Sequence, residues 1–134
     1  MGDLAILARR ADFLRVAGSG KKWAAAGMVV QACPIRGPAA AKGESVSATP
    51  SLRVGFTASK KVGGAVVRNR ARRRLMALAR EVLLSEAAPG YDYVLIARAE
   101  TATRDFEALR GDMRSALKRL KLLQTRAPAT GMRP

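Results

Sequence analysis

The residues best able to do chemistry in this sequence are basic side chains gathered between Arg53 and Arg80. Nine lysines and arginines fall in this segment, and no aspartate or glutamate falls among them. So many uncompensated cations repel one another unless a partner neutralises them. The segment is therefore predicted to bind a polyanion, with an ordinary solvated charged surface as the alternative. Its cations are Arg53, Lys60, Lys61, Arg68, Arg70, Arg72, Arg73, Arg74 and Arg80.

Helical geometry spreads most of these charges over one predicted helix, which runs from Ala65 to about Leu84. At about 100° per residue, Val67, Ala71, Leu75, Leu78 and Val82 fall on one side and form the expected core face. The arginines occupy both flanks and the outer side, and their planar guanidinium groups suit bidentate phosphate contacts. Asn69 lies among them and could read a base edge or a 2′-hydroxyl. An ordinary surface polar residue is the equal alternative for Asn69.

The segment Ser59-Lys60-Lys61-Val62-Gly63-Gly64 joins a predicted strand to the start of this helix. Free backbone N–H groups at a helix N-terminus favour an anion, and the two lysines add positive charge. The segment is therefore a candidate phosphate site, with a flexible strand–helix turn as the alternative.

The whole composition supports a polyanion partner. Twenty-five lysines and arginines face ten aspartates and glutamates, which gives a formal net charge of +15 over 134 residues. A strongly positive electrostatic field would not help an enzyme bind small neutral metabolites, whereas it attracts nucleic acid. A membrane surface is the second partner class, but the longest apolar stretch, Trp23 to Val30, is far shorter than the roughly 20 residues needed to span a bilayer.

Several chemistries are excluded by missing residue types. The sequence has no histidine, which removes histidine-based acid–base and nucleophilic catalysis and most zinc sites. Cys33 is the only cysteine and cannot form an internal disulfide, so a reducing cytoplasm is expected. Cys33 itself is expected to be a core strand residue. Trp23 is expected to pack in the core or at an edge, with a base-stacking platform as the alternative. No secretory signal pattern follows Met1.

The remaining periodicities predict an α+β fold. Short helical spacing covers 9–17, and β-rich runs cover 23–33, 52–58 and 91–98. Thr103 is a plausible N-cap for a last helix, which reaches about Leu123 and carries an apolar stripe. The expected order is α-β-β-α-β-α, a single two-layer domain over residues 1–124 in which helices pack on a mixed sheet. Residues 34–51 are expected to be a mobile connection, and residues 125–134 a disordered tail.

The string RVGFTASKKVGGAVVRNRARRRL, residues 53–75, resembles the signature of the protein component of bacterial ribonuclease P. In that family a strand ending in S-K-K-x-G-x-A-V leads into a helix with an R-N-R motif, which here is Arg68-Asn69-Arg70. The strings ADFLRV (11–16) and YDYVLIAR (91–98) resemble the first helix of the family and the strand after its basic helix. The resemblance covers roughly residues 9–122.

The resemblance implies an RNA–protein enzyme in which the RNA subunit performs the chemistry. That enzyme hydrolyses a phosphodiester bond of precursor tRNA and releases the 5′ leader, with Mg²⁺ held mainly by the RNA. The protein would be an accessory subunit, inactive alone, with no catalytic residue of its own and no obligate protein partner. The family fold also implies a left-handed β-α-β crossover, against the general rule.

Two residue sets follow from the resemblance. The catalytic RNA would be bound by the basic helix and its neighbours, and the leader would follow a cleft between the first helix and the sheet. Aromatic residues that often line that cleft are replaced here at Ala17, Met28 and Gln31, so leader binding is expected to rely more on charge and shape than on base stacking. Gly64 replaces a frequent asparagine and Met76 a frequent base. The predicted RNA-binding residues are Arg53, Lys60, Lys61, Arg68, Asn69, Arg70, Arg72 and Arg73, and the predicted cleft residues are Phe13, Arg15, Met28, Gln31, Thr57 and Ser59.

Two other functions share some of these features. A ribosomal or assembly RNA-binding protein would have similar charge, but it has no reason to carry S-K-K-x-G before R-N-R. An autonomous nuclease would need clustered acids or a histidine, and the acids of this sequence show no spacing typical of a two-metal site.

Overall fold

The computed structural model describes residues 5–7, 9–35, 52–88 and 90–123. Its strands are β1 (Ala5–Ile6), β2 (Lys21–Ala24), β3 (Met28–Pro34), β4 (Leu52–Thr57) and β5 (Tyr91–Ala97). Its α-helices are α1 (Arg10–Ser19), α3 (Ala65–Leu78), α4 (Leu84–Glu86) and α5 (Phe106–Arg119). A π-helical turn at Ala79–Leu83 joins α3 to α4, and single 3₁₀ turns lie at Lys60–Val62 and Ala99–Ala102.

The strands form one mixed sheet in the order β1-β4-β5-β3-β2. The pairs β1–β4 and β4–β5 are parallel, while β2–β3 and β3–β5 are antiparallel. The α+β class and the mixed sheet are thus confirmed. Helix α3 connects the adjacent parallel strands β4 and β5, as a β-α-β crossover requires, and the left hand of that crossover stays a prediction.

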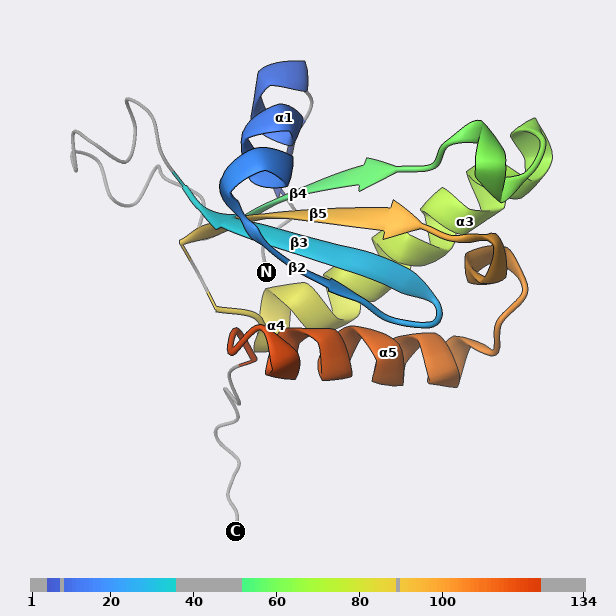
Figure 1. Ribbon diagram of the computed structural model, residues 1–134. Helices are drawn as coiled ribbons and strands as arrows, with labels where there is room; N and C mark the ends of the chain where they lie inside the picture. Colours follow the sequence, from blue (N-terminus) through green and yellow to red (C-terminus); the bar gives the residue numbers. More distant parts are fainter. Residues whose placement is uncertain (1–4, 8, 36–51, 89, 124–134) are drawn as a thin grey trace, which may run out of the picture.

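Helices α3 and α5 pack against one face of the sheet, and α1 lies against the other (Figure 1). The main core fills the space between the sheet and the α3/α5 layer, where Leu75, Leu95 and Leu117 are fully buried. A smaller apolar cluster lies beneath α1 and includes Val16, Cys33 and Val94. The expected burial of Cys33 is therefore confirmed. No helix in the described part of the chain is long and apolar enough to cross a membrane.

Local sequence explains why the basic helix begins where it does. Gly63 adopts φ 149°, a backbone conformation that favours glycine, and breaks the chain direction between the 3₁₀ turn and α3. Gly64 then serves as the N-cap. The buried side of the helix includes Ala71, Leu75 and Leu78, as predicted, but Val67 is 37% exposed and belongs to the outer surface.

Two parts of the element prediction are wrong. Residues 23–33 are not one strand, because β2 and β3 form a hairpin in which the Ala25 N–H donates to the Met28 carbonyl oxygen at 2.8 Å. Gly27 lets this turn pack closely against α5, since a Cβ there would lie 2.3 Å from Leu109 Cδ2. The two-residue strand β1 was also missed.

The last helix begins later than predicted. Its N-cap is Asp105 rather than Thr103, and the Asp105 carboxylate accepts hydrogen bonds from the backbone N–H groups of Glu107 and Ala108. An ionised carboxylate satisfies the free N–H groups of a first turn and interacts favourably with the helix dipole. The apolar stripe is confirmed, with Leu109, Met113 and Leu117 fully buried.

Candidate nucleic-acid interface

The outer surface of α3 carries cations that form no ion pair within the described residues. Asn69, Arg70, Arg72 and Arg73 are exposed, and Arg68 is half-buried. All ion pairs within the described residues use arginines of other elements, namely Arg15, Arg53, Arg104, Arg110 and Arg114. The Arg68 Nε atom is buried and has no hydrogen-bond partner. The charge of this surface is therefore available to a polyanion.

Arg74, although on the same helix, is used inside the protein. Its guanidinium donates to the carbonyl oxygens of Thr101 at 2.7 Å and Arg104 at 2.6 Å. It also lies 5.6 Å from the centre of the Phe106 ring. Arg74 therefore ties α3 to the segment that precedes α5, and it is a structural residue rather than part of the outer surface.

The N-terminus of α3 has the features of an anion site. No side chain caps the helix, and no acidic residue lies in its first turn. Uncapped N–H groups of a first turn, together with the helix dipole, favour a phosphate. Ser59 shapes the approach, because its hydroxyl accepts a hydrogen bond from the Lys61 N–H at 3.3 Å. Lys60 and Lys61 are exposed beside it, and Val66 in the first turn is 80% exposed.

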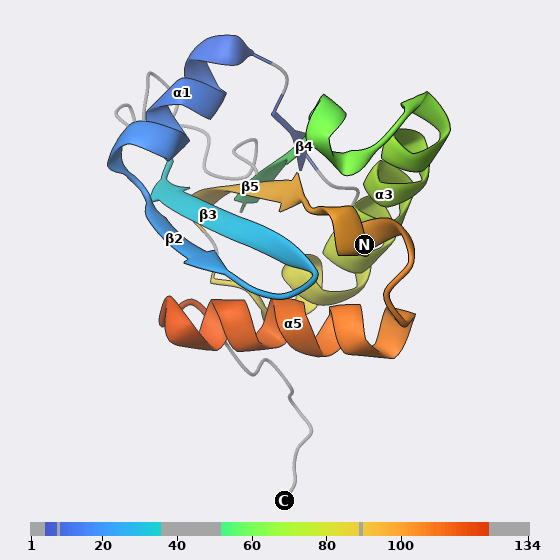
Figure 2. The same cartoon turned by 45° about the vertical axis from the view of Figure 1, so that its right-hand side comes forward.

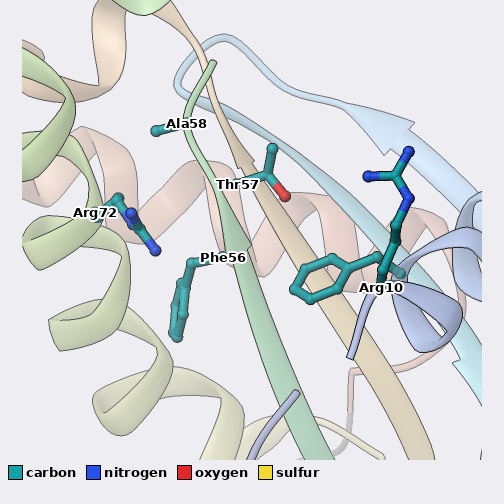
Figure 3. Close-up of a pocket in the computed structure, with 6 residues that line it drawn as sticks. Arg10, Phe56, Thr57, Ala58 and Arg72 are labelled. Carbon is teal, nitrogen blue, oxygen red and sulfur yellow. The ribbon is translucent and has the colours of Figure 1, made fainter. Parts of the chain in front are cut away.

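A hollow of about 410 Å³ opens between α1, the end of β4 and α3. Figure 3 shows Arg72 reaching from α3 toward Phe56, with Thr57 and then Arg10 on the α1 side. The hollow has arginines at its two ends and aromatic rings and small side chains along its walls, so it can accept both the phosphates and the bases of a single nucleic-acid strand. Its lining consists of Arg10, Phe13, Phe56, Thr57, Ala58 and Arg72.

Gly55 sets how closely α1 approaches the sheet. A Cβ on Gly55 would lie 2.6 Å from two ring atoms of Phe13 and 3.1 Å from Leu7 Cβ. The distances to the ring are shorter than contacts of a real Cβ allow, and the distance to Leu7 Cβ is tight. The Phe13 ring therefore packs on the bare backbone of β4, and this contact places the ring at the wall of the hollow.

A buried carboxylate joins α1 to the sheet. Asp92 of β5 is fully buried, and both of its oxygens accept hydrogen bonds from Arg53 of β4 at 2.7 Å. Arg15 of α1 forms an ion pair with the same carboxylate, and it also donates to the Pro34 carbonyl oxygen at 3.0 Å and to Cys33 Sγ at 3.2 Å. The hydrogen bond to Asp92 raises the pKa of Arg53 above its usual value, although burial opposes this.

Only some of the predicted cleft residues lie at the hollow. Phe13 and Thr57 line the hollow, and Ser59 follows it along the chain. Arg15 and the predicted RNA ligand Arg53 are instead bound to Asp92. Gln31 is only 8% exposed.

Met28 does not lie in the cleft. It is fully buried in the main core, on the opposite face of the sheet from α1. A strand turns alternate side chains to opposite faces, so an error of one residue in register moves a side chain across the sheet.

Sequence reasoning missed three lining residues, Arg10, Phe56 and Ala58. The strand pattern over residues 52–58 includes Phe56, but a strand pattern does not state which elements its side chains will meet. No sequence signal pointed to Arg10 or Ala58. Arg72 was predicted to bind RNA, and the structure shows that it also closes one side of the hollow.

Comparison with known proteins decides the family. A family model described as Ribonuclease P matches residues 1–121. The ribonuclease P protein component of Paramagnetospirillum magneticum is 51% identical over 118 residues, which cover 88% of this chain and 84% of that protein. The chain belongs to the ribonuclease P protein family. The family's protein component from Ruegeria pomeroyi is 47% identical over 118 residues, covering 87% of this chain and 86% of that protein.

Solved structures of ribonuclease P proteins share the fold. The Staphylococcus aureus protein aligns with a TM-score of 0.69 at 23% identity, covering 91% of this chain and all of that one. The Thermotoga maritima protein aligns with a TM-score of 0.65 at 26% identity, covering 84% and 94%. Members of the ribonuclease P protein family are accessory subunits of an endoribonuclease that processes tRNA, and membership implies ribonuclease P RNA as a partner. The expected family, function and enzyme role are confirmed.

Proposed function

We propose that this ribonuclease P protein uses the outer surface of α3 to bind the catalytic RNA and the hollow beneath α1 to bind the 5′ leader of precursor tRNA. The observation that carries the proposal is the position of Arg72. Arg72 lies on α3, the proposed RNA-binding helix, and also lines the hollow, so both RNAs would meet at one residue. A leader strand in the hollow would thereby be held beside the catalytic RNA.

The hollow favours binding that tolerates leader sequence. Its walls offer two aromatic rings, Phe13 and Phe56, and two cations, Arg10 and Arg72. Ring faces accept any base, and guanidinium groups bind phosphates without reading sequence. We therefore expect contacts with the leader to depend on its presence and length more than on its bases.

We propose that ribonuclease P RNA holds the Mg²⁺ of the reaction. Within the described residues, no three side chains of the histidine, cysteine, aspartate or glutamate types come together as a metal site. The protein side chains near the hollow are cationic, which disfavours a divalent ion there. The protein would act by binding, in the cytoplasm where precursor tRNA is made.

Affinity for ribonuclease P RNA tests the α3 surface. The double variant Arg68→Ala/Arg70→Ala should weaken binding at least tenfold, which corresponds to about 1.4 kcal/mol. It should also lower the slope of log K against log salt by roughly 1.4 to 1.8, because about 0.7 to 0.9 counterion is released per phosphate contact. The matched control is Lys22→Gln/Arg98→Gln, which removes two exposed cations outside both sites. Equal affinities for the two double variants would refute the assignment.

Affinity of the assembled holoenzyme for precursor tRNA tests the hollow. Phe13→Ala and Arg10→Gln should each bring the affinity for precursor tRNA closer to that for mature tRNA, while affinity for ribonuclease P RNA stays unchanged. If both variants keep the full preference for the leader-bearing substrate, the leader does not lie in this hollow.

A further inference from the structure

A second cationic surface lies at the far edge of the sheet from β4. It is formed by the end of α5 and by the edge strand β2, and we call it the Trp23 patch. A hollow of about 510 Å³ lies within it, lined by Ser115, Lys118, Arg119 and Lys121. None of its cations takes part in an ion pair of the described residues. The patch consists of Lys21, Trp23, Ser115, Lys118, Arg119 and Lys121.

The strand and the helix hold the patch together through two contacts. The Lys21 ammonium donates to the Leu120 carbonyl oxygen at 3.2 Å. The Arg119 guanidinium lies 5.2 Å from the centre of the Trp23 ring, and Trp23 remains 38% exposed. A cation–π contact uses none of the N–H donors of a guanidinium, and Arg119 makes no hydrogen bond through its side chain within the described residues. Arg119 therefore lies against Trp23 with its donors available to an anion.

Lys121 occupies a position that usually belongs to glycine. Its φ is 63°, in the left-handed region. The Lys121 N–H donates to the Lys118 carbonyl oxygen at 3.0 Å, and the Leu122 N–H donates to the Leu117 carbonyl oxygen at 2.8 Å. This pair of bonds is the Schellman closure of a helix, in which glycine is favoured. A lysine here adds charge to the patch at a site where its backbone is strained.

The patch is separate from the surface already assigned to RNA. Helix α5 packs on β2 and β3, whereas α3 packs on β4 and β5, so the two surfaces occupy opposite sides of the same layer (Figure 2). The described cations that form no ion pair are concentrated on these two surfaces. In the Trp23 patch, guanidinium and ammonium groups without an ion pair lie beside an exposed indole ring, and this combination fits the phosphates and bases of RNA rather than an acidic peptide or a lipid surface.

We propose that the Trp23 patch binds a second segment of RNA backbone, supplied either by ribonuclease P RNA or by precursor tRNA. The proposal rests on the RNA partnership of the family and does not depend on the α3 assignment. In the holoenzyme the protein would then contact RNA on two sides, through α3 at one edge of the sheet and through the end of α5 at the other.

The first test compares Arg119→Gln/Lys121→Gly with the matched control Lys22→Gln/Arg98→Gln, since both remove two cations. We expect the patch variant, but not the control, to weaken RNA binding at least fivefold. Binding is measured in two titrations, one with ribonuclease P RNA and one of the assembled holoenzyme with precursor tRNA. A loss with ribonuclease P RNA identifies that RNA as the source. A loss only when the assembled holoenzyme binds precursor tRNA identifies the tRNA. Equal affinities of the patch and control variants in both titrations would overturn the proposal, and Arg68→Ala/Arg70→Ala tests the α3 assignment separately.

The single variant Lys121→Gly separates binding from folding. Glycine relieves the left-handed strain, so the midpoint of thermal unfolding should equal or exceed that of the parent, while RNA affinity should fall about two- to threefold. A loss of affinity together with a lower midpoint would show that Lys121 has only a structural role.

Crosslinking provides a direct location. Cys33 is buried, so an exposed cysteine introduced by Ser115→Cys can be labelled selectively with a photo-crosslinker. The control label is at Glu107→Cys, about 12 Å along the same helix in its acidic first turn. We expect the label at 115 to attach to RNA in the holoenzyme–precursor complex and the label at 107 not to. Equal yields at both positions, or no RNA adduct at 115, would overturn the proposal.

Discussion

Replacing Asp92 by asparagine removes the charge that joins α1 to the sheet while keeping the shape of the side chain. In the parent, the buried carboxylate is shared by Arg15 and Arg53. Removing one partner of a buried ion pair usually costs about 3–5 kcal/mol, because the remaining charge stays desolvated. Here the two arginine side chains are 23% and 27% exposed and can turn partly toward water. We therefore expect Asp92→Asn to lower the free energy of unfolding by about 2–3 kcal/mol.

The functional consequence should be selective. Helix α1 carries Arg10 and Phe13 into the hollow, so a loosened α1 should reduce the preference for leader-bearing tRNA. The outer surface of α3 does not contact Asp92, and affinity for ribonuclease P RNA should stay within about twofold of the parent. Urea unfolding followed by circular dichroism gives the stability, and titration of the holoenzyme with precursor and mature tRNA gives the preference.

A double-mutant cycle identifies the partner. Arg15→Met alone should lower stability, and in the Asp92→Asn background it should have a much smaller effect, because the pair is already broken. If Asp92→Asn changes the unfolding free energy by less than about 0.5 kcal/mol, the value typical of surface substitutions, the network does not hold α1 in place. Additive effects of the two substitutions would likewise contradict a direct pair.

Three further changes test other contacts. Gly55→Ala should displace Phe13, cost about 1–3 kcal/mol by overpacking and reduce the preference for precursor tRNA; an unchanged preference in a binding titration would contradict the placement of the ring. Arg74→Lys should lose two hydrogen bonds to backbone oxygens and about 1–3 kcal/mol of stability, and the folded variant should keep its affinity for ribonuclease P RNA. The hydrogen bond from Arg110 lowers the pKa of Glu81 below its usual 4.5, so its contribution to stability is present above that value and is lost as pH falls through the lower folded value. Unfolding measured from neutral to acidic pH should show a shallower decline for Glu81→Gln, and an unchanged slope would contradict the role of this pair.

The sequence was most informative where periodicity and charge agree. The stripe that includes Leu109, Met113 and Leu117 predicted the buried face of α5, because burial of a helix follows its own period of 3.6 residues. The outer arginines of α3 were predicted for the same reason. The phosphate-binding role of each residue stays a prediction, because neither the fold nor the family comparison assigns roles to single side chains.

The errors have a common physical origin in contacts between distant parts of the chain. The ion pair of Arg15 was not predicted, because its partner Asp92 lies 77 residues away and becomes a neighbour only when β5 enters the sheet, and the role of Arg15 in the leader cleft stays a prediction. Met28 was placed on the wrong face, because the face of a strand depends on the register set by the β2–β3 hairpin. The predicted mobile connection over 34–51 lies outside the described residues except for residues 34 and 35, and the predicted disordered tail over 125–134 lies entirely outside them.

The central claim is that this protein assists ribonuclease P RNA in removing the 5′ leader. The most direct measurement is cleavage of a precursor tRNA by that RNA at low Mg²⁺, with and without the protein. We expect the protein to restore or strongly raise cleavage at the mature 5′ end and to be inactive alone. Binding of the RNA without any change in cleavage would contradict this role and leave only a structural RNA-binding function.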